Sequence, residues 1–146
     1  GVRNYPSLRK EFLSRGLDRF PNLSLVDYIY DMPDRLSAAD VVINRAGAMT
    51  ISELALLGKA SILIPSPNVT DNHQFKNAKL LSDSGAALLL EESSLTGDSL
   101  ASSVDSLLSS RSLRSSLESS IAPFALPDAN IFIYNELKAL VNGAKV

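Results

Sequence analysis

The sequence predicts an α/β fold in which a mainly parallel sheet is covered by helices on both faces. Short apolar, β-branched runs alternate with amphipathic helical segments along the chain. The strand-like runs are continuously apolar, which is typical of strands buried on both faces. A chain of 146 residues, 45% of them hydrophobic, is sufficient for the core of one domain. In such a sheet the ligand crevice lies beyond the carboxyl ends of the strands.

The first predicted elements are a helix, a strand and a short helix. The stretch "YPSLRKEFLSRGL" predicts a surface helix, because Leu8, Phe12 and Leu13 fall on one helical face. The apolar segment "LSLVDYI" (residues 23 to 29) predicts a strand, and Pro33 in "DMPDRLSAA" suits an early position of a short helix.

The central part of the chain predicts a βαβαβ order. "DVVIN" (residues 40 to 44) is a β-branched strand, "TISELALLG" is a helix closed by Gly58, and "ASILIP" (residues 60 to 65) is the next strand. "HQFKNAKLLSDSG" (residues 73 to 85) has helical spacing, and "AALLLEE" (residues 86 to 92) supplies a fourth strand. Functional residues are therefore expected in the loops that follow the strands.

The last third of the chain predicts helices. Residues 93 to 120 hold 13 serines, a composition that also fits a disordered linker, but apolar residues recur there at helical spacing. We therefore favour an amphipathic helix. Asp128 suits the cap of a last helix, whose apolar stripe comprises Ile131, Tyr134, Leu137, Leu140 and Val141.

Composition excludes several classes of function. The net charge of −2, with 14 basic and 16 acidic residues well mixed, disfavours binding to nucleic acid. The chain has no cysteine, and a solitary His73 cannot build a histidine-rich metal site. No apolar run approaches the ~20 residues of a membrane span, and the first residues lack a signal peptide's apolar centre. We therefore expect a soluble, cytoplasmic protein.

The small residues of "NRAGAMTISE" lie where a strand passes into a helix. The first N–H groups of that helix have no backbone partners, and Ala46 and Gly47 leave room for a phosphate to approach them. Thr50 suits either the helix cap or a phosphate oxygen. Glu53, about one turn on, is placed to accept hydrogen bonds from a ribose diol. The pattern indicates a nucleotide site, although small residues at such turns also serve packing alone.

A second polar cluster, "SPNVTDNHQFKNA", follows the next strand. Asp71 or Asn72 is the expected helix cap, and His73 and Gln74 lie in the first turn. Neutral donors and acceptors of this kind suit sugar hydroxyls. The alternative for His73 is a half-exposed bystander without a ligand.

The segments "RAGAMTISELALLGKASILIP" and "DNHQFKNA", with "YIYDM" upstream and "PDAN" near the end, resemble the C-terminal domain of the MurG family over residues 1 to 141. Members of that family are inverting GT-B glycosyltransferases. They transfer N-acetylglucosamine from UDP-N-acetylglucosamine to lipid I, which gives lipid II for peptidoglycan. The resemblance implies a Rossmann-like sheet and a peripheral location at the inner face of the plasma membrane for the full-length protein.

The resemblance also implies roles for individual residues. Ile29 of "YIYDM" would meet the uracil through its backbone, and Gln74, with neighbouring His73, would bind hydroxyls of the donor sugar. Glu53 would bind the ribose hydroxyls. The diphosphate and ribose would be lined by Ala48, Met49, Thr50, Ile51, Ser52 and Glu53. The arrangement requires no metal and no cofactor.

The resemblance further implies that residues 1 to 146 form one incomplete C-terminal domain. The first two strands and a glycine-rich loop of the family domain are missing, so we expect unpaired strand edges and exposed apolar surface. The catalytic base, the lipid I site and the membrane contact would belong to an absent N-terminal domain. Three alternatives are a subunit of a split glycosyltransferase, a non-catalytic nucleotide-sugar-binding module, and a lipid or sterol glycosyltransferase of the same fold.

Overall fold

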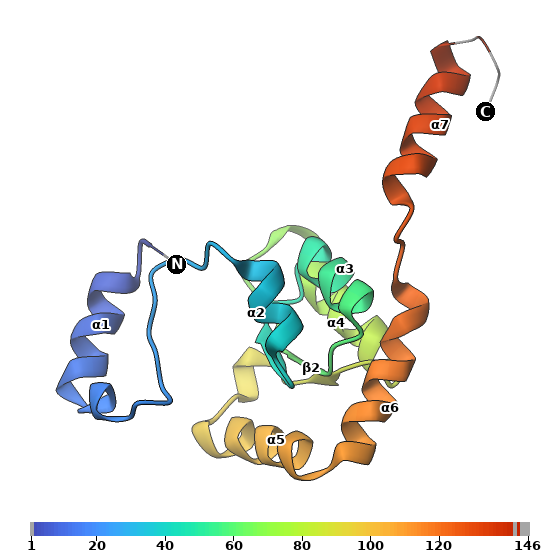
Figure 1. Ribbon diagram of the computed structural model, residues 1–146. Coiled ribbons are helices and arrows are strands. Elements are labelled where there is room, and N and C mark those ends of the chain that lie inside the picture. The colour runs from blue at the N-terminus through green and yellow to red at the C-terminus, as the bar shows by residue number, and fades with distance from the viewer. Residues whose placement is uncertain (1, 142, 144–146) are drawn as a thin grey trace. The chain divides into compact units, whose positions relative to one another are not determined.

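The computed structural model describes residues 2–141 and 143. The chain divides into two compact units, residues 1–35 and residues 36–146, here called the N-terminal and C-terminal units (Figure 1). The expectation that the whole chain is a single domain stays a prediction.

The N-terminal unit is helical. It contains the predicted surface helix α1 (Tyr5–Ser14), none of whose residues is buried, and the short helix η1 (Leu17–Arg19). The predicted strand at residues 23 to 29 is wrong, because the segment has no strand conformation. A strand needs a neighbouring strand for its backbone hydrogen bonds, and the described residues of this unit contain none.

The C-terminal unit is built on a parallel sheet of three strands instead of the predicted four. The strands are β1 (Val42–Asn44), β2 (Ser61–Leu63) and β3 (Leu88–Leu89), in the order β1-β2-β3. Ile43 pairs with Ile62, and Leu63 pairs with Leu89. All three strands therefore end at the same edge of the sheet.

One face of the sheet is covered by α3 (Ala48–Leu57) and α4 (His73–Asp83), and Leu36, near the end of α2 (Met32–Ala38), belongs to the same core. Leu54 of α3 and Leu81 of α4 pack in this core beside Leu63 of β2. The helix α3 ends at Gly58 as predicted, and the left-handed φ of 60° there favours glycine.

The other face is covered by α5 (Gly97–Ser109) and α6 (Arg111–Ile121), so the predicted two-sided cover is confirmed. Leu107 and Leu117 pack against Ile62 and Ile64. The serine-rich segment is helical as predicted but broken at Ser110, whose hydroxyl accepts a hydrogen bond from the Leu113 amide at 3.2 Å. Short helices η2 (Thr70–Asn72), η3 (Glu92–Ser94) and η4 (Ala122–Phe124) complete the connections.

The expected unpaired edge and exposed apolar surface are present. Among the described residues β1 pairs with β2 alone, and its Ile43 is 45% exposed. The predicted last helix is α7 (Ala129–Val141), which contains no buried residue. Its stripe therefore forms but stays exposed, including Ile131, Tyr134, Leu137, Leu140 and Val141. Within residues 2–141 and 143, no helix has the length and apolarity to cross a membrane.

Candidate binding site at the carboxyl edge of the sheet

The turn after β1 is held in a strained conformation by two amide side chains. Ala46 is fully buried and has a φ of 59°, the left-handed region that alanine rarely adopts. The Ala46 N–H donates to Oδ1 of Asn44 at 2.9 Å, and the Ala46 carbonyl accepts from Nδ2 of Asn77 at 3.4 Å. These contacts offset a strain of roughly 1 to 2 kcal/mol and aim the chain into α3.

The first turn of α3 presents free backbone donors. Gly47 is the residue before the helix, and no side chain caps it. The Ile51 amide donates to the Gly47 carbonyl at 3.0 Å, whereas the amides of Gly47, Ala48, Met49 and Thr50 have no acceptor in the part of the chain that the structure describes. Ala48 and Met49 are exposed. Together with the positive end of the helix dipole, these amides form an environment suited to an anion.

The other predicted residues of this run differ in their surroundings. Thr50 is half-buried within the first helical turn and is not the cap residue. Ile51 packs against the core, and the Ser52 hydroxyl donates back to the Ala48 carbonyl at 3.1 Å. Glu53 is exposed, and its carboxylate has no hydrogen-bond or ion-pair partner among residues 2–141 and 143. Glu53 is therefore free to accept hydrogen bonds from a ligand.

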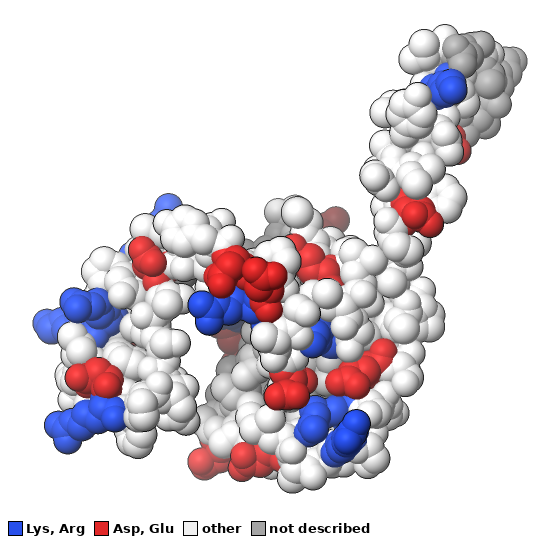
Figure 2. Space-filling model, in the orientation of Figure 1, with Lys and Arg blue, Asp and Glu red and all other residues white. Residues whose placement is uncertain are grey.

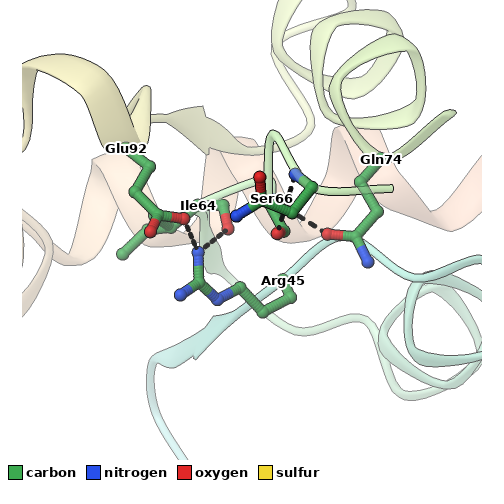
Figure 3. A network of polar contacts seen from close by, with 6 residues as sticks. Arg45, Ile64, Ser66, Gln74 and Glu92 are labelled. Atoms are coloured by element: carbon green, nitrogen blue, oxygen red, sulfur yellow. Dashed lines mark hydrogen bonds and ion pairs between the residues drawn. The ribbon is translucent and has the colours of Figure 1, made fainter. Parts of the chain in front are cut away.

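Gln74 in α4 is oriented by the loop after β2. The Ser66 N–H donates to Oε1 of Gln74 at 2.9 Å, and Figure 3 shows the side chain reaching toward Ser66. Because the backbone N–H needs an acceptor, the oxygen faces Ser66 and the NH₂ group keeps two donors for other partners. His73 is exposed, and its Nδ1 lies 2.6 Å from the Thr70 carbonyl, which leaves Nε2 as the free ring nitrogen.

The "NHQFKNA" motif thus has structural duties besides its predicted contacts. Asn72 occupies the predicted cap position, but its side chain makes no capping hydrogen bond. Asn77 ties α4 to the turn before α3, and Ala78 is fully buried in the core. The motif therefore fixes Gln74 relative to the first turn of α3.

Two functional candidates were not predicted from the sequence, Arg45 after β1 and Glu92 after β3. Arg45 forms an ion pair with the Glu92 carboxylate, and the same nitrogen, Nη1, lies 3.5 Å from the Ile64 carbonyl (Figure 3). The guanidinium therefore joins the segments that follow the three strands. One sequence signal was available, since Arg45 is the only basic residue in the loops that follow these strands.

Two hollows lie near this edge. One of about 180 Å³ is lined by Pro65, Ser66, Phe75 and Glu92, among others. A second of about 200 Å³, lined by Ala48, Ser52, Asn77 and Phe124 with their neighbours, lies beside the start of α3. Gln74 lines neither of them.

Ile29, predicted to meet a nucleobase, lies half-buried in a loop of the N-terminal unit. Figure 2 shows basic and acidic side chains intermingled on the visible face, in keeping with the mixed charge of the sequence. The roles of the predicted site residues stay predictions.

These features define a class of protein, an α/β domain of the parallel-sheet type with an anion-receptive helix N-terminus at the carboxyl edge. The particular family follows from comparison with known proteins. The model of the glycosyltransferase family 28 C-terminal domain matches residues 1–129, and the chain belongs to this family.

Curated relatives support the assignment. The chain is 42% identical over 125 residues to a UDP-N-acetylglucosamine--N-acetylmuramyl-(pentapeptide) pyrophosphoryl-undecaprenol N-acetylglucosamine transferase of Bacillus licheniformis, a match that covers 86% of this chain and 34% of the relative. It is 41% identical over 120 residues to the transferase of the same name from Bacillus cytotoxicus, covering 82% and 33%. The chain thus spans about a third of the length of these relatives.

A solved structure supports the fold. The crystal structure of MurG from Acinetobacter baumannii superimposes with a TM-score of 0.71 at 33% identity, covering 79% of this chain and 33% of that chain. The predicted resemblance to the MurG family and the Rossmann-like fold of the C-terminal half of a GT-B glycosyltransferase are therefore confirmed.

Proposed function

We propose that this chain is the UDP-N-acetylglucosamine-binding part of an inverting glycosyltransferase that converts lipid I to lipid II. The observation that carries the proposal is the set of free amides from Gly47 to Thr50 at the carboxyl edge of the sheet. The names of the relatives supply the donor and acceptor, since both Bacillus proteins are named as N-acetylglucosamine transferases acting on a pyrophosphoryl-undecaprenol compound.

The free amides suit the diphosphate of the donor. Negative charge develops on that group as the glycosidic bond breaks, and fixed N–H donors at a helix N-terminus stabilise it without reorganisation. The Ala46 strain and the exposure of Ala48 serve the same end, because they bring backbone donors to the surface without a covering side chain.

Two side chains would add specificity. Glu53, exposed and free, would accept hydrogen bonds from the ribose hydroxyls. Gln74, with its oxygen held by Ser66, would donate through its NH₂ group to hydroxyls of the sugar. A site built to pair with particular hydroxyls rejects analogues that lack them. His73 would assist through its free Nε2.

The acceptor, the general base and the membrane contact would be supplied by another part of the enzyme. We place the full-length protein in the cytoplasm, peripheral to the inner face of the plasma membrane. Because the chain covers about a third of its relatives, we expect these 146 residues to show no transferase activity alone and to bind UDP weakly.

Calorimetric titration tests the proposal. The chain should bind UDP-N-acetylglucosamine, and Glu53→Ala should weaken binding about tenfold or more, as expected for a lost hydrogen bond to a charged group. Gln74→Glu keeps an oxygen for the Ser66 amide but removes the NH₂ donors. It should therefore reduce the affinity for UDP-N-acetylglucosamine relative to UDP. Binding that ignores both substitutions would contradict the proposed site.

A further inference from the structure

The loops that follow the three strands are poor in positive charge. Residues 45–47, 64–72 and 90–96 contain one basic side chain, Arg45, against three acids, Asp71, Glu91 and Glu92. A nucleoside diphosphate is multiply anionic, whereas a helix N-terminus supplies only about half a positive charge. The free amides alone therefore supply too little positive charge to balance a diphosphate. Arg45 is the basic side chain in these loops that can supply the rest.

Arg45 forms an ion pair with an acidic side chain of these same loops. Its Nη1 forms the ion pair with Glu92, while its Nε and Nη2 have no partner among residues 2–141 and 143. The Arg45 side chain is 56% exposed and the Glu92 side chain 39% exposed. Ion pairs this exposed contribute little to stability. Hydrogen bonds between a guanidinium and a phosphate are stronger and commonly bidentate.

The position of Arg45 allows the exchange of partners. Arg45 stands three residues before Ala48, where α3 begins, and the strained Ala46 turn lies between them. The Ile64 carbonyl lies beside the guanidinium, so the loop after β2 carries the Arg45 contact at Ile64 and the Gln74 contact at Ser66 (Figure 3). The guanidinium itself faces Glu92 and the Ile64 carbonyl (Figure 3). Three residues span at most about 10 Å, so the Arg45 side chain, once released from Glu92, can turn toward a diphosphate bound at the start of α3.

We propose that Arg45 exchanges Glu92 for the donor diphosphate, and that Glu92 acts as an internal competitor for that cation. The inference rests on the proposed function. Without ligand, the Glu92 carboxylate neutralises Arg45, so the loops that follow the strands do not attract anions in general. A diphosphate anchored by the α3 amides displaces the carboxylate and gains the guanidinium. The pair therefore sets how strongly the site prefers a nucleoside diphosphate over an uncharged nucleoside.

The competing explanation is that the ion pair has a purely structural role and only joins two loops. The two explanations differ in the sign of one effect. If Glu92 competes, its neutralisation strengthens binding of UDP. If the pair is purely structural, the loss of either partner weakens binding of every ligand at the carboxyl edge of the sheet.

The test compares UDP with uridine by calorimetric titration of the 146-residue chain and its variants. Glu92→Gln should raise the affinity for UDP about fivefold, the upper end for an exposed ion pair. Arg45→Gln should lower it about tenfold, the factor for a lost hydrogen bond to a charged group. Neither should change the affinity for uridine. Glu91→Gln, which removes the same charge one residue away, is the matched control and should have less effect than Glu92→Gln.

The double variant Arg45→Gln/Glu92→Gln completes the cycle. In the Arg45→Gln background, Glu92→Gln should raise the affinity for UDP no more than Glu91→Gln does. Urea unfolding verifies that each variant is folded. If Arg45→Gln does not fold, the direction in which Glu92→Gln changes the affinity for UDP is sufficient to decide whether Glu92 competes for Arg45. Weaker UDP binding in Glu92→Gln, or equal gains in Glu91→Gln and Glu92→Gln, would overturn the inference.

The same titrations separate this inference from the proposed function. UDP binding that shifts the amide resonances of residues 47 to 50 but does not respond to Glu92→Gln would leave the donor site standing and remove the role of Arg45. A chain that does not bind UDP at all would remove both.

Discussion

Replacing Ala48 with proline deletes one of the free amides without disturbing the helix. Ala48 is the first residue of α3, a position where proline is favoured because its missing N–H would have no helical partner. The preceding Gly47 has φ −67° and ψ 144°, the extended conformation that a residue before proline requires. The fold should therefore tolerate Ala48→Pro, with a stability equal to the parent or up to about 1 kcal/mol higher.

The effect on binding follows from the lost donor. A hydrogen bond to a charged group contributes roughly 1.5 to 3 kcal/mol, and each 1.4 kcal/mol is about a factor of ten in affinity. Ala48 is exposed, so we take the lower end and expect UDP to bind about tenfold more weakly to Ala48→Pro. The expected affinity for uridine is unchanged, because uridine lacks phosphate. Calorimetric titration with both ligands measures the difference.

Gly97→Pro is the matched control. Gly97 is the first residue of α5, and Thr96 before it is extended, with ψ 163°. The capping box there uses Thr96 and Ser99 and leaves the Gly97 amide unused. This variant should bind UDP as the parent does. Equal UDP affinities for the parent and Ala48→Pro, with both proteins folded, would refute the role of the α3 amides.

Four further outcomes are expected. Glu53→Gln should weaken binding of UDP but not of its 2′,3′-dideoxy analogue in parallel titrations, and equal losses for both would contradict a ribose contact. Leu54→Ala should lower the free energy of unfolding in urea by about 2 to 5 kcal/mol, because Leu54 is fully buried, and an unchanged midpoint would argue against that packing. Gly58→Ala should lower the free energy of unfolding by about 1 to 2 kcal/mol, because Gly58 has a left-handed φ of 60°, although open space surrounds the added Cβ. Gly97→Ala, where the added Cβ also meets open space but φ is not positive, should not lower the free energy of unfolding. The isolated chain should transfer no N-acetylglucosamine to lipid I in a radiolabel assay, and measurable turnover would show that the acceptor half is dispensable.

The elements with strong periodicity were predictable because local patterns determine them. The run around Leu54 and the run around Leu81 formed the expected helices on one face of the sheet. The segment at residues 23 to 29 failed because strand formation depends on a partner, which apolarity alone cannot supply. The break at Ser110 was hidden by the uniform serine composition, although its capping hydroxyl is an ordinary start signal.

The site was predictable in part. The small residues before α3 indicated free amides, and the structure leaves those amides open. The contacts that shape the site join residues distant in sequence. Asn77 lies 31 residues from Ala46, and Glu92 lies 47 residues from Arg45. No periodicity encodes such pairs, so the strained turn and the ion pair at the strand ends became visible only in three dimensions.

The central claim is that the amides at the start of α3 receive the diphosphate of the donor. Titration of the ¹⁵N-labelled chain with UDP, followed by amide chemical shifts, tests it most directly. We expect the resonances of Gly47, Ala48, Met49 and Thr50 to move the furthest, and those at the starts of α5 and α6 to stay in place. Saturation of the chain by UDP with unmoved resonances from Gly47 to Thr50 would contradict the claim.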